Sequence, residues 1–212
     1  MKSSFFKLSL KQQEQIINAA LEEFTKQGYA KASTNTIVEK AEISKGMLFY
    51  YFNNKQTLFN FLIDYGIDFI KSEYFAKIDD SEPDFIKRYK GIAKVKMESY
   101  SKNPYVYNFL GTIYLNGYKN VPEKKVEVLT CLTKEAMEGL YKDIDYSIFR
   151  NDINPEKILK FIAWSFDGYE KELSANLEGM QLNEVDYAPY WDEFDEYIEL
   201  LKKLFYKQDG EE

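Results

Sequence analysis

The chain has 212 residues, of which 45% are hydrophobic and 17% aromatic, enough apolar material for the core of one large domain or two smaller ones. It contains no histidine, which excludes a Ser/His/Asp hydrolase, a Cys/His protease and a His-ligated zinc site. Cys131 is the only cysteine, so no disulfide can form within the chain. Its helical surroundings favour an ordinary packed thiol, with a redox sensor as the alternative.

Charge is distributed unevenly around a net value of -7. Residues 1–55 carry eight lysines and five glutamates, a net charge of +3, whereas the rest of the chain carries 20 basic and 30 acidic residues, a net charge of -10. Because an acidic surface repels phosphate, this asymmetry assigns any contact with a polyanion to the N-terminal segment.

No apolar run approaches the ~20 residues that cross a bilayer. The opening MKSSFFKLSLK has lysines but no sustained apolar stretch, so it does not resemble a secretory signal. We therefore expect a cytoplasmic protein with no membrane partner.

Apolar residues recur along nearly the whole chain at spacings of three and four, and no convincing run of alternating strand residues interrupts them. Prolines and turn-forming residues separate these segments. The pattern predicts an all-α protein of about nine helices, the first three of them short.

The first helix is predicted to begin with a capping box, in which Ser9 accepts a bond from the backbone N–H three residues on and Gln12 reaches back. Gly28 is placed to end this helix in a left-handed conformation. The apolar stripe of the helix consists of Ile17, Ala20, Leu21 and Phe24.

Two further short helices follow, joined by residues 42–44. The second runs from Ser33 to about Ala41, with Ile37 and Ala41 on its buried side, and Ser44 can cap a third helix, Lys45 to Phe52. Two short helices with a tight turn, preceded by a supporting helix, are the layout of a helix-turn-helix.

The third helix has two different faces. At 100° per residue, Leu48 and Phe52 coincide on one side with Phe49 flanking them. The residues that are predicted to point away are Gly46, Met47, Tyr50 and Tyr51. Such a face suits a DNA groove, where glycine permits close approach of the backbone and hydroxyls bond to phosphate. Judged on periodicity alone, a docking module with an aromatic core remains the alternative.

Residues 43–58, ISKGMLFYYFNNKQTL, resemble the recognition segment of the tetracycline-repressor (TetR) family of transcriptional regulators. That segment has a small apolar residue, Ser, any residue and Gly, then an aromatic, a His or Tyr, a Phe and, three residues later, a Lys. The end of the first helix, from Phe24 to Tyr29, and residues 37–41 match as well. The resemblance covers roughly residues 9–60, about a quarter of the chain.

The resemblance implies a set of DNA-binding residues. They are Ser33, Thr34 and Thr36 on phosphate, Lys45, Gly46 and Met47 on bases and backbone, Phe49, Tyr50 and Tyr51 in an aromatic cluster, and Lys55 on phosphate. Two positions depart from the family pattern. Glu42 stands where the family often has glycine, and Phe49 replaces the more usual tyrosine, which removes one hydroxyl that could bond to phosphate.

The resemblance also divides the chain into a helix-turn-helix DNA-binding domain, residues 1–55, and a helical ligand-binding and dimerisation domain, residues 56–212. A fourth helix over about residues 56–78 links the two. In the family, ligand entry moves this helix, changes the spacing of two recognition helices and lowers DNA affinity.

Aromatic residues concentrate in the later helices, where they predict a pocket for a flat or lipophilic ligand, with an ordinary aromatic core as the alternative. The pocket candidates are Tyr65, Met97, Tyr100, Tyr107, Tyr114, Tyr118, Trp164 and Tyr169. In the family the last two long helices pack against a twofold copy, and here they span about residues 154–177 and 187–206. The implied dimer-interface residues are Phe161, Ser165, Trp191, Phe194, Ile198 and Leu201.

We therefore expect a sequence-specific DNA-binding regulator, acting as a repressor. Its homodimer would place two recognition helices one DNA turn (~34 Å) apart on a palindromic operator, and a small-molecule inducer would release it. The alternative keeps the DNA-binding head but makes the C-terminal domain a docking module for a protein partner. No motif predicts a catalytic residue, a cofactor or a metal site, so we do not expect an enzyme.

Overall fold

The computed structural model describes residues 3–177 and 185–208, and within these ranges it contains nine α-helices and no β-strand. The helices are α1 (Leu10–Lys31), α2 (Thr34–Lys40), α3 (Lys45–Phe52), α4 (Lys55–Glu73), α5 (Phe85–Lys102), α6 (Pro104–Leu115), α7 (Glu123–Tyr141), α8 (Pro155–Asn176) and α9 (Ala188–Phe205). Short 3-10 helices occur at η1 (Ser3–Lys7), η2 (Phe75–Lys77) and η3 (Tyr146–Ile148). The predicted all-α architecture is confirmed.

The chain forms two compact units. The first comprises Met1–Lys77 and Val95–Ala136, and the second comprises Ile78–Lys94 and Met137–Glu212. The predicted helix-turn-helix domain, residues 1–55, lies entirely inside the first unit, and its boundary after residue 55 stays a prediction. None of the described helices has the length and apolar character that crossing a lipid bilayer demands.

Helix α1 begins as predicted. Ser9 Oγ accepts from the Gln12 backbone N–H at 3.3 Å, while Gln12 Oε1 accepts from the Ser9 N–H at 3.3 Å. Its predicted apolar stripe is buried throughout. Gly28 has the expected positive φ, 67°, and interrupts the regular helical geometry where the sequence predicts the end of the helix; a short helical segment up to Lys31 follows this kink. The kink turns the last residues of α1 toward the start of α2.

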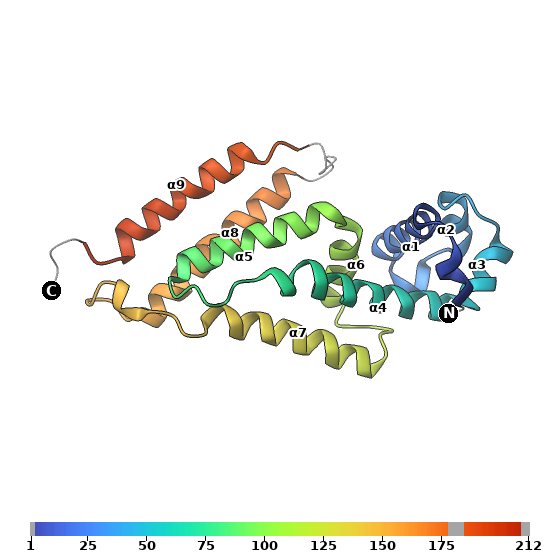
Figure 1. Cartoon of the computed structure of the whole chain (residues 1–212), viewed down its shortest axis with the longest axis horizontal. Coiled ribbons are helices and arrows are strands. Elements are labelled where there is room, and N and C mark those ends of the chain that lie inside the picture. Colours follow the sequence, from blue (N-terminus) through green and yellow to red (C-terminus); the bar gives the residue numbers. More distant parts are fainter. Residues whose placement is uncertain (1–2, 178–184, 209–212) are drawn as a thin grey trace. The chain divides into compact units, whose positions relative to one another are not determined.

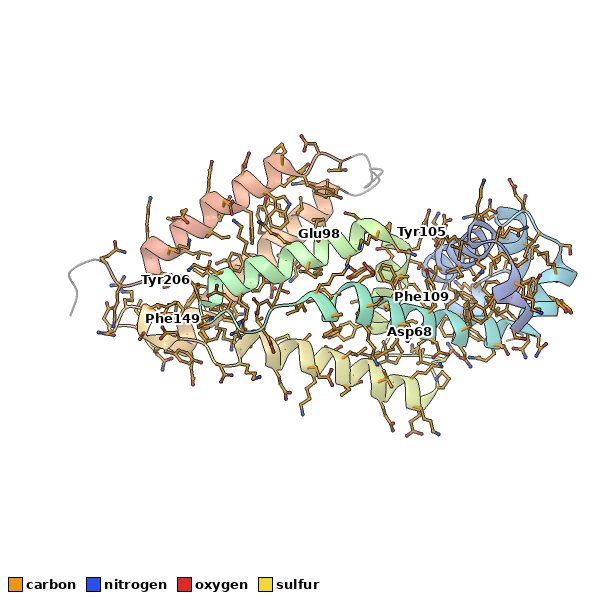
Figure 2. All side chains as sticks on the ribbon, in the orientation of Figure 1. Asp68, Glu98, Tyr105, Phe109, Phe149 and Tyr206 are labelled. Carbon is orange, nitrogen blue, oxygen red and sulfur yellow. The ribbon has the colours of Figure 1, made fainter. Side chains whose placement is uncertain are left out.

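The core of the first unit is built on α1, α4 and α6. One ring from each helix contributes: the Phe59 ring of α4 lies 5.0 Å from that of Phe24 and 5.5 Å from that of Phe109, centroid to centroid. Figure 2 labels Phe109. Figure 1 shows α1, α2 and α3 grouped around the N-terminal end of α4. Only α2 and α3 are short, and they pack against the longer helices α1 and α4.

The second unit is built on α8 and α9, which lie side by side (Figure 1), together with the first turns of α5. Arg88 of α5 is fully buried, and its Nη1 donates to the carbonyl of Gly139 at 2.9 Å and to that of Lys142, at the C-terminal end of α7. Phe149 and Tyr206 stack edge to face with centroids 5.3 Å apart (Figure 2). This unit therefore combines an aromatic core with a buried cation that caps a helix end.

Candidate nucleic-acid interface

Two serines set where the short helices begin. Ser33 Oγ accepts from the Thr36 N–H at 3.4 Å at the start of α2, and Ser44 Oγ accepts from the Met47 N–H at 3.1 Å at the start of α3. A serine cap typically stabilises a helix by about 1 kcal/mol, because it satisfies one of the unpaired N–H groups of the first turn. The predicted bounds of the third helix, Lys45 to Phe52, are confirmed.

The turn between α2 and α3 contains a residue in the left-handed region. Glu42 has φ 54°, and the next residue, Ile43, donates its N–H to Val38 O at 3.0 Å. A residue with a Cβ adopts this conformation at a cost of about 1–2 kcal/mol, which glycine avoids. The turn thus keeps the geometry that glycine favours even though the chain has a glutamate there.

Helix α3 divides into a buried and an exposed face. Leu48 and Phe52 are buried as predicted, whereas Lys45 and Gly46 are exposed and Tyr50 is 53% exposed. A Cβ built on Gly46 meets nothing closer than Ser44 Oγ at 3.9 Å, so the chain's own packing does not require glycine there. Met47 and Phe49 are half-buried at the edges of the exposed face.

Tyr51 departs from the sequence-based expectation. It was placed on the exposed face, but it is only 8% exposed, and its ring lies 5.6 Å from that of Phe5 in η1. Tyr51 lies only about 60° around the helix from Leu48, so one additional packing element is enough to cover it. Sequence reasoning missed Phe5, which is fully buried against Phe52 and Phe61 as well, because η1 is too short to show a periodic pattern.

Lys55, the first residue of α4, bonds to its own chain. Its Nζ donates to Ala30 O at 3.2 Å and to Ala32 O at 3.1 Å, and lies 4.9 Å from the centroid of the Tyr29 ring. The nearby Ser33, Thr34 and Thr36 are half-buried at the start of α2. The predicted contacts of these four residues with DNA stay predictions.

The lysines near α2 and α3 differ in whether they form ion pairs with neighbouring carboxylates. Lys26 and Lys40 both bond to Glu22, at 2.6 and 2.9 Å, and hold the pKa of that carboxyl below its usual value. Lys45 lies exposed at the start of α3. Of the two lysines that α2 and α3 contain, Lys45 is therefore the one whose charge is better placed for a phosphate or a base.

The predicted pocket residues are divided between the two units. Those in the first unit are Tyr65, Met97, Tyr100, Tyr107, Tyr114 and Tyr118, and those in the second are Trp164 and Tyr169. Tyr100 and Tyr107 pack with centroids 5.5 Å apart, and burial raises the pKa of both hydroxyls. Two open hollows of about 440 and 460 Å³ occur on the described surface, and none of the eight residues lines either of them.

The predicted dimer-interface residues fall into two groups. Phe194, Ile198 and Leu201 of α9 are buried in the core of their own unit, where the Phe194 ring lies 5.0 Å from that of Phe166, so the structure corrects the predicted interface at these three positions. Trp191 is half-buried beside them. Phe161 and Ser165 of α8 are exposed. The α8–α9 apolar face, as we call it, consists of the exposed residues Phe161, Trp164, Tyr197, Leu200 and Leu204.

A family model described as "Bacterial regulatory proteins, tetR family" matches residues 16–61, which include α2, α3 and the start of α4. A curated relative, the "Probable acrEF/envCD operon repressor" of Escherichia coli (strain K12), is 33% identical over 52 residues. That alignment spans 24% of this chain and 24% of the relative. The family model thus matches the N-terminal part of the chain, and the curated alignment spans about a quarter of each protein.

Solved structures resemble the chain over nearly its whole length. A TetR family transcriptional regulator from Chloroflexus aurantiacus J-10-FL has a TM-score of 0.65 at 18% identity, and the alignment covers 98% of this chain and 99% of that one. The ketosteroid transcriptional regulator KstR2 of Mycobacterium tuberculosis has a TM-score of 0.62 at 15% identity, with 95% and 97% covered. At these identities the likeness concerns the fold.

Proposed function

We propose that the chain is a transcriptional regulator of the TetR family, whose model matches residues 16–61. It acts as a repressor, binds a palindromic DNA operator as a homodimer and is released by a small lipophilic or aromatic ligand. A duplex target also places the proposed activity in the cytoplasm.

The observation that carries the proposal is the division of α3 into two faces. Leu48 and Phe52 anchor the helix in its own domain, and the opposite side presents Lys45, Gly46 and Tyr50. A major groove admits one α-helix, the absent Cβ of Gly46 allows close approach, and a lysine can bond to phosphate or to guanine. This face offers the chemistry that reads a duplex.

The α8–α9 apolar face supports the homodimer. It exposes two large aromatic rings of α8, Phe161 and Trp164, and Ser165 lies beside them. The rings of Phe161 and Phe205 lie 6.5 Å apart, which joins the α8 part of the face to the end of α9. Exposed apolar surface of this kind marks association sites, and a twofold axis pairs such a face with itself.

The aromatic residues of the first unit support a ligand-binding role. Tyr65, Tyr100 and Tyr107 are half-buried, and burial raises the pKa of each hydroxyl above its usual value. Each hydroxyl can donate one hydrogen bond. Aromatic faces with a few hydroxyl groups fit a flat or lipophilic molecule.

A gel-shift salt titration on the DNA upstream of the chain's own gene tests the function. We expect the logarithm of affinity to fall linearly with the logarithm of salt concentration, by ~0.9 for each phosphate contacted. A complete lack of binding to any neighbouring intergenic duplex would defeat the proposal. Analytical ultracentrifugation of the complex should give two chains per duplex.

Thermal shift with a panel of lipophilic and cationic compounds tests the ligand part separately. A molecule that binds the folded chain raises the melting temperature, by mass action. It should also release the chain from the duplex in the gel shift. If the whole panel leaves both readouts unchanged, the ligand part is abandoned in favour of a protein partner as the signal.

A further inference from the structure

One peptide group in the first unit is held at both ends by charged side chains. The carbonyl oxygen of the Ala32–Ser33 peptide accepts from Lys55 Nζ at 3.1 Å, and the N–H of the same peptide donates to Glu23 Oε1 at 2.9 Å. Glu23 lies on α1 and Lys55 begins α4, so two helices grip the segment between α1 and α2.

Burial of the Glu23 carboxylate is unfavourable by itself, so its hydrogen bond to the Ala32–Ser33 peptide is needed to compensate for the lost solvation. Glu23 is 5% exposed, and a buried carboxylate is costly unless a strong partner compensates. Hydrogen bonds in which one partner is charged are about twice as strong as neutral ones. The ammonium at the peptide oxygen and the carboxylate at the peptide N–H both polarise this peptide, so each hydrogen bond strengthens the other.

The clamped peptide lies where the backbone changes direction. The kink at Gly28 precedes it, with the Ala32 N–H donating to Gly28 O at 3.1 Å, and Ser33, the capping residue of α2, follows it. Orientation of this one peptide therefore sets where the first turn of α2 points. That turn carries Thr34 and Thr36.

We propose that Glu23 and Lys55 form a peptide clamp that positions the start of α2, and that Lys55 supports DNA binding as a positioning residue through this peptide instead of by a phosphate contact. The inference rests on the proposed function, because it assigns Lys55 a role in that same site.

The bonding of Lys55 supports this role. An ammonium has three N–H donors, and two of them go to Ala30 O and Ala32 O. The group also lies over the Tyr29 ring, which adds a cation–π attraction on another side. A charge held in this way is committed to the chain's own backbone, and it ties the first residue of α4 to the start of α2.

Salt dependence separates the two roles of Lys55. Replacing a phosphate-contacting lysine lowers the log–log salt slope by ~0.9, whereas replacing a positioning lysine weakens binding at an unchanged slope. We expect Lys55→Met to weaken binding to the upstream duplex about tenfold with the slope retained. Lys55→Arg should recover most of the affinity, because a guanidinium can donate to both carbonyls. A slope lowered by ~0.9, or an arginine variant no better than the methionine variant, would overturn the clamp.

A double-mutant cycle tests whether the two side chains act together. Glu23→Leu should weaken DNA binding, and Glu23→Gln should weaken it less, because an amide oxygen still accepts from the Ser33 N–H. The double variant Glu23→Leu with Lys55→Met should lose less binding free energy than the sum of the losses of the two single variants. Full additivity would contradict the clamp. Lys26→Met is the matched control, because Lys26 lies on α1 like Glu23 but pairs with Glu22. This variant should keep its affinity for the duplex within about twofold of the parent's.

Amide hydrogen exchange tests, in the absence of DNA, whether Glu23 protects the Ser33 N–H. In Glu23→Leu the Ser33 amide should exchange at least about tenfold faster than in the parent chain, while the amide of Phe109 in α6 keeps its rate. Equal Ser33 rates in both proteins would overturn the clamp. If the parent chain binds no duplex but the Ser33 amide behaves as expected, the proposed function fails together with the role of Lys55 in DNA binding, whereas the positioning of α2 by the clamp stands.

Discussion

Helices α3 and α9 are both rich in aromatic residues, yet the sequence predicts the surroundings of those residues better in α3 than in α9. In α3 the side chains predicted to be buried, Leu48 and Phe52, are buried. In α9 the residues predicted to meet a second copy, among them Phe194 and Ile198, are instead buried in their own chain.

The two helices differ in the range of the contacts that fix them. The Ser44 side chain caps α3 through a hydrogen bond to a residue three positions away. The N-cap residue of α9, Tyr187, makes no side-chain cap bond, and α9 instead packs through Phe194 on Phe166 of α8. Periodicity identifies an apolar face in both helices. It does not say whether that face is covered by the same chain or by a copy.

The largest expected effect tests the buried face of α9. Phe194→Ala should lower the free energy of unfolding by about 3–5 kcal/mol, because it removes a ring that packs on Phe166 and Tyr169 and leaves a cavity. Urea denaturation measures this, with Glu196→Ala, at an exposed position of α9 outside the α8–α9 apolar face, as the control. A loss from Phe194→Ala no larger than the control's would return this position to the predicted interface.

The exposed side of α8 should show the opposite behaviour. Trp164 is 57% exposed, so Trp164→Ala should leave the monomer's fold intact but weaken self-association by about 2 kcal/mol, roughly thirtyfold. Sedimentation equilibrium over a range of concentrations measures the dissociation constant. Unchanged association would remove the α8–α9 apolar face from the dimer.

A smaller effect on stability is expected at Glu42, in the turn before α3. Glu42→Gly should raise the free energy of unfolding by about 0.5–1 kcal/mol, because relief of the left-handed conformation outweighs the greater chain entropy of glycine. Thermal or urea denaturation detects this gain. A destabilised variant would mean that the Glu42 side chain makes a contact worth more than the strain.

The smallest expected effect is a change in the pKa of Glu73, which pairs with Lys102, far away in the sequence, and with Lys77, four residues away. Lys102 of α5 and then Lys77 lower the pKa of Glu73 to about 2. The folded-state pKa is depressed, so the stabilisation is present above the ordinary pKa of 4.5 and is lost as pH falls toward 2. In an NMR titration Lys102→Met should raise the pKa of Glu73 more than Lys77→Met does. The reverse order would give the local partner the greater weight.

The sequence alone located most of the first three helices, because caps and turn residues act over three or four positions. Ser9, Ser33 and Ser44 each begin a helix as predicted. Tyr51 was misplaced because its cover, Phe5, comes from a segment 46 residues away in the chain. The bonds of Glu23 and Lys55 to the Ala32–Ser33 peptide were missed for the same reason, since no pattern links three separate segments.

Gly46 offers the most direct test of the claim that the exposed face of α3 enters a duplex groove. Gly91 of α5 is the matched control, since an added Cβ meets nothing closer than 3.9 Å at Gly46 and nothing within 4 Å at Gly91, and alanine should stabilise each helix by up to about 1 kcal/mol. Affinity for the upstream duplex should fall roughly tenfold or more in Gly46→Ala and stay unchanged in Gly91→Ala, while both variants melt at or above the parent temperature. Equal, undiminished affinity in the two alanine variants would contradict the account.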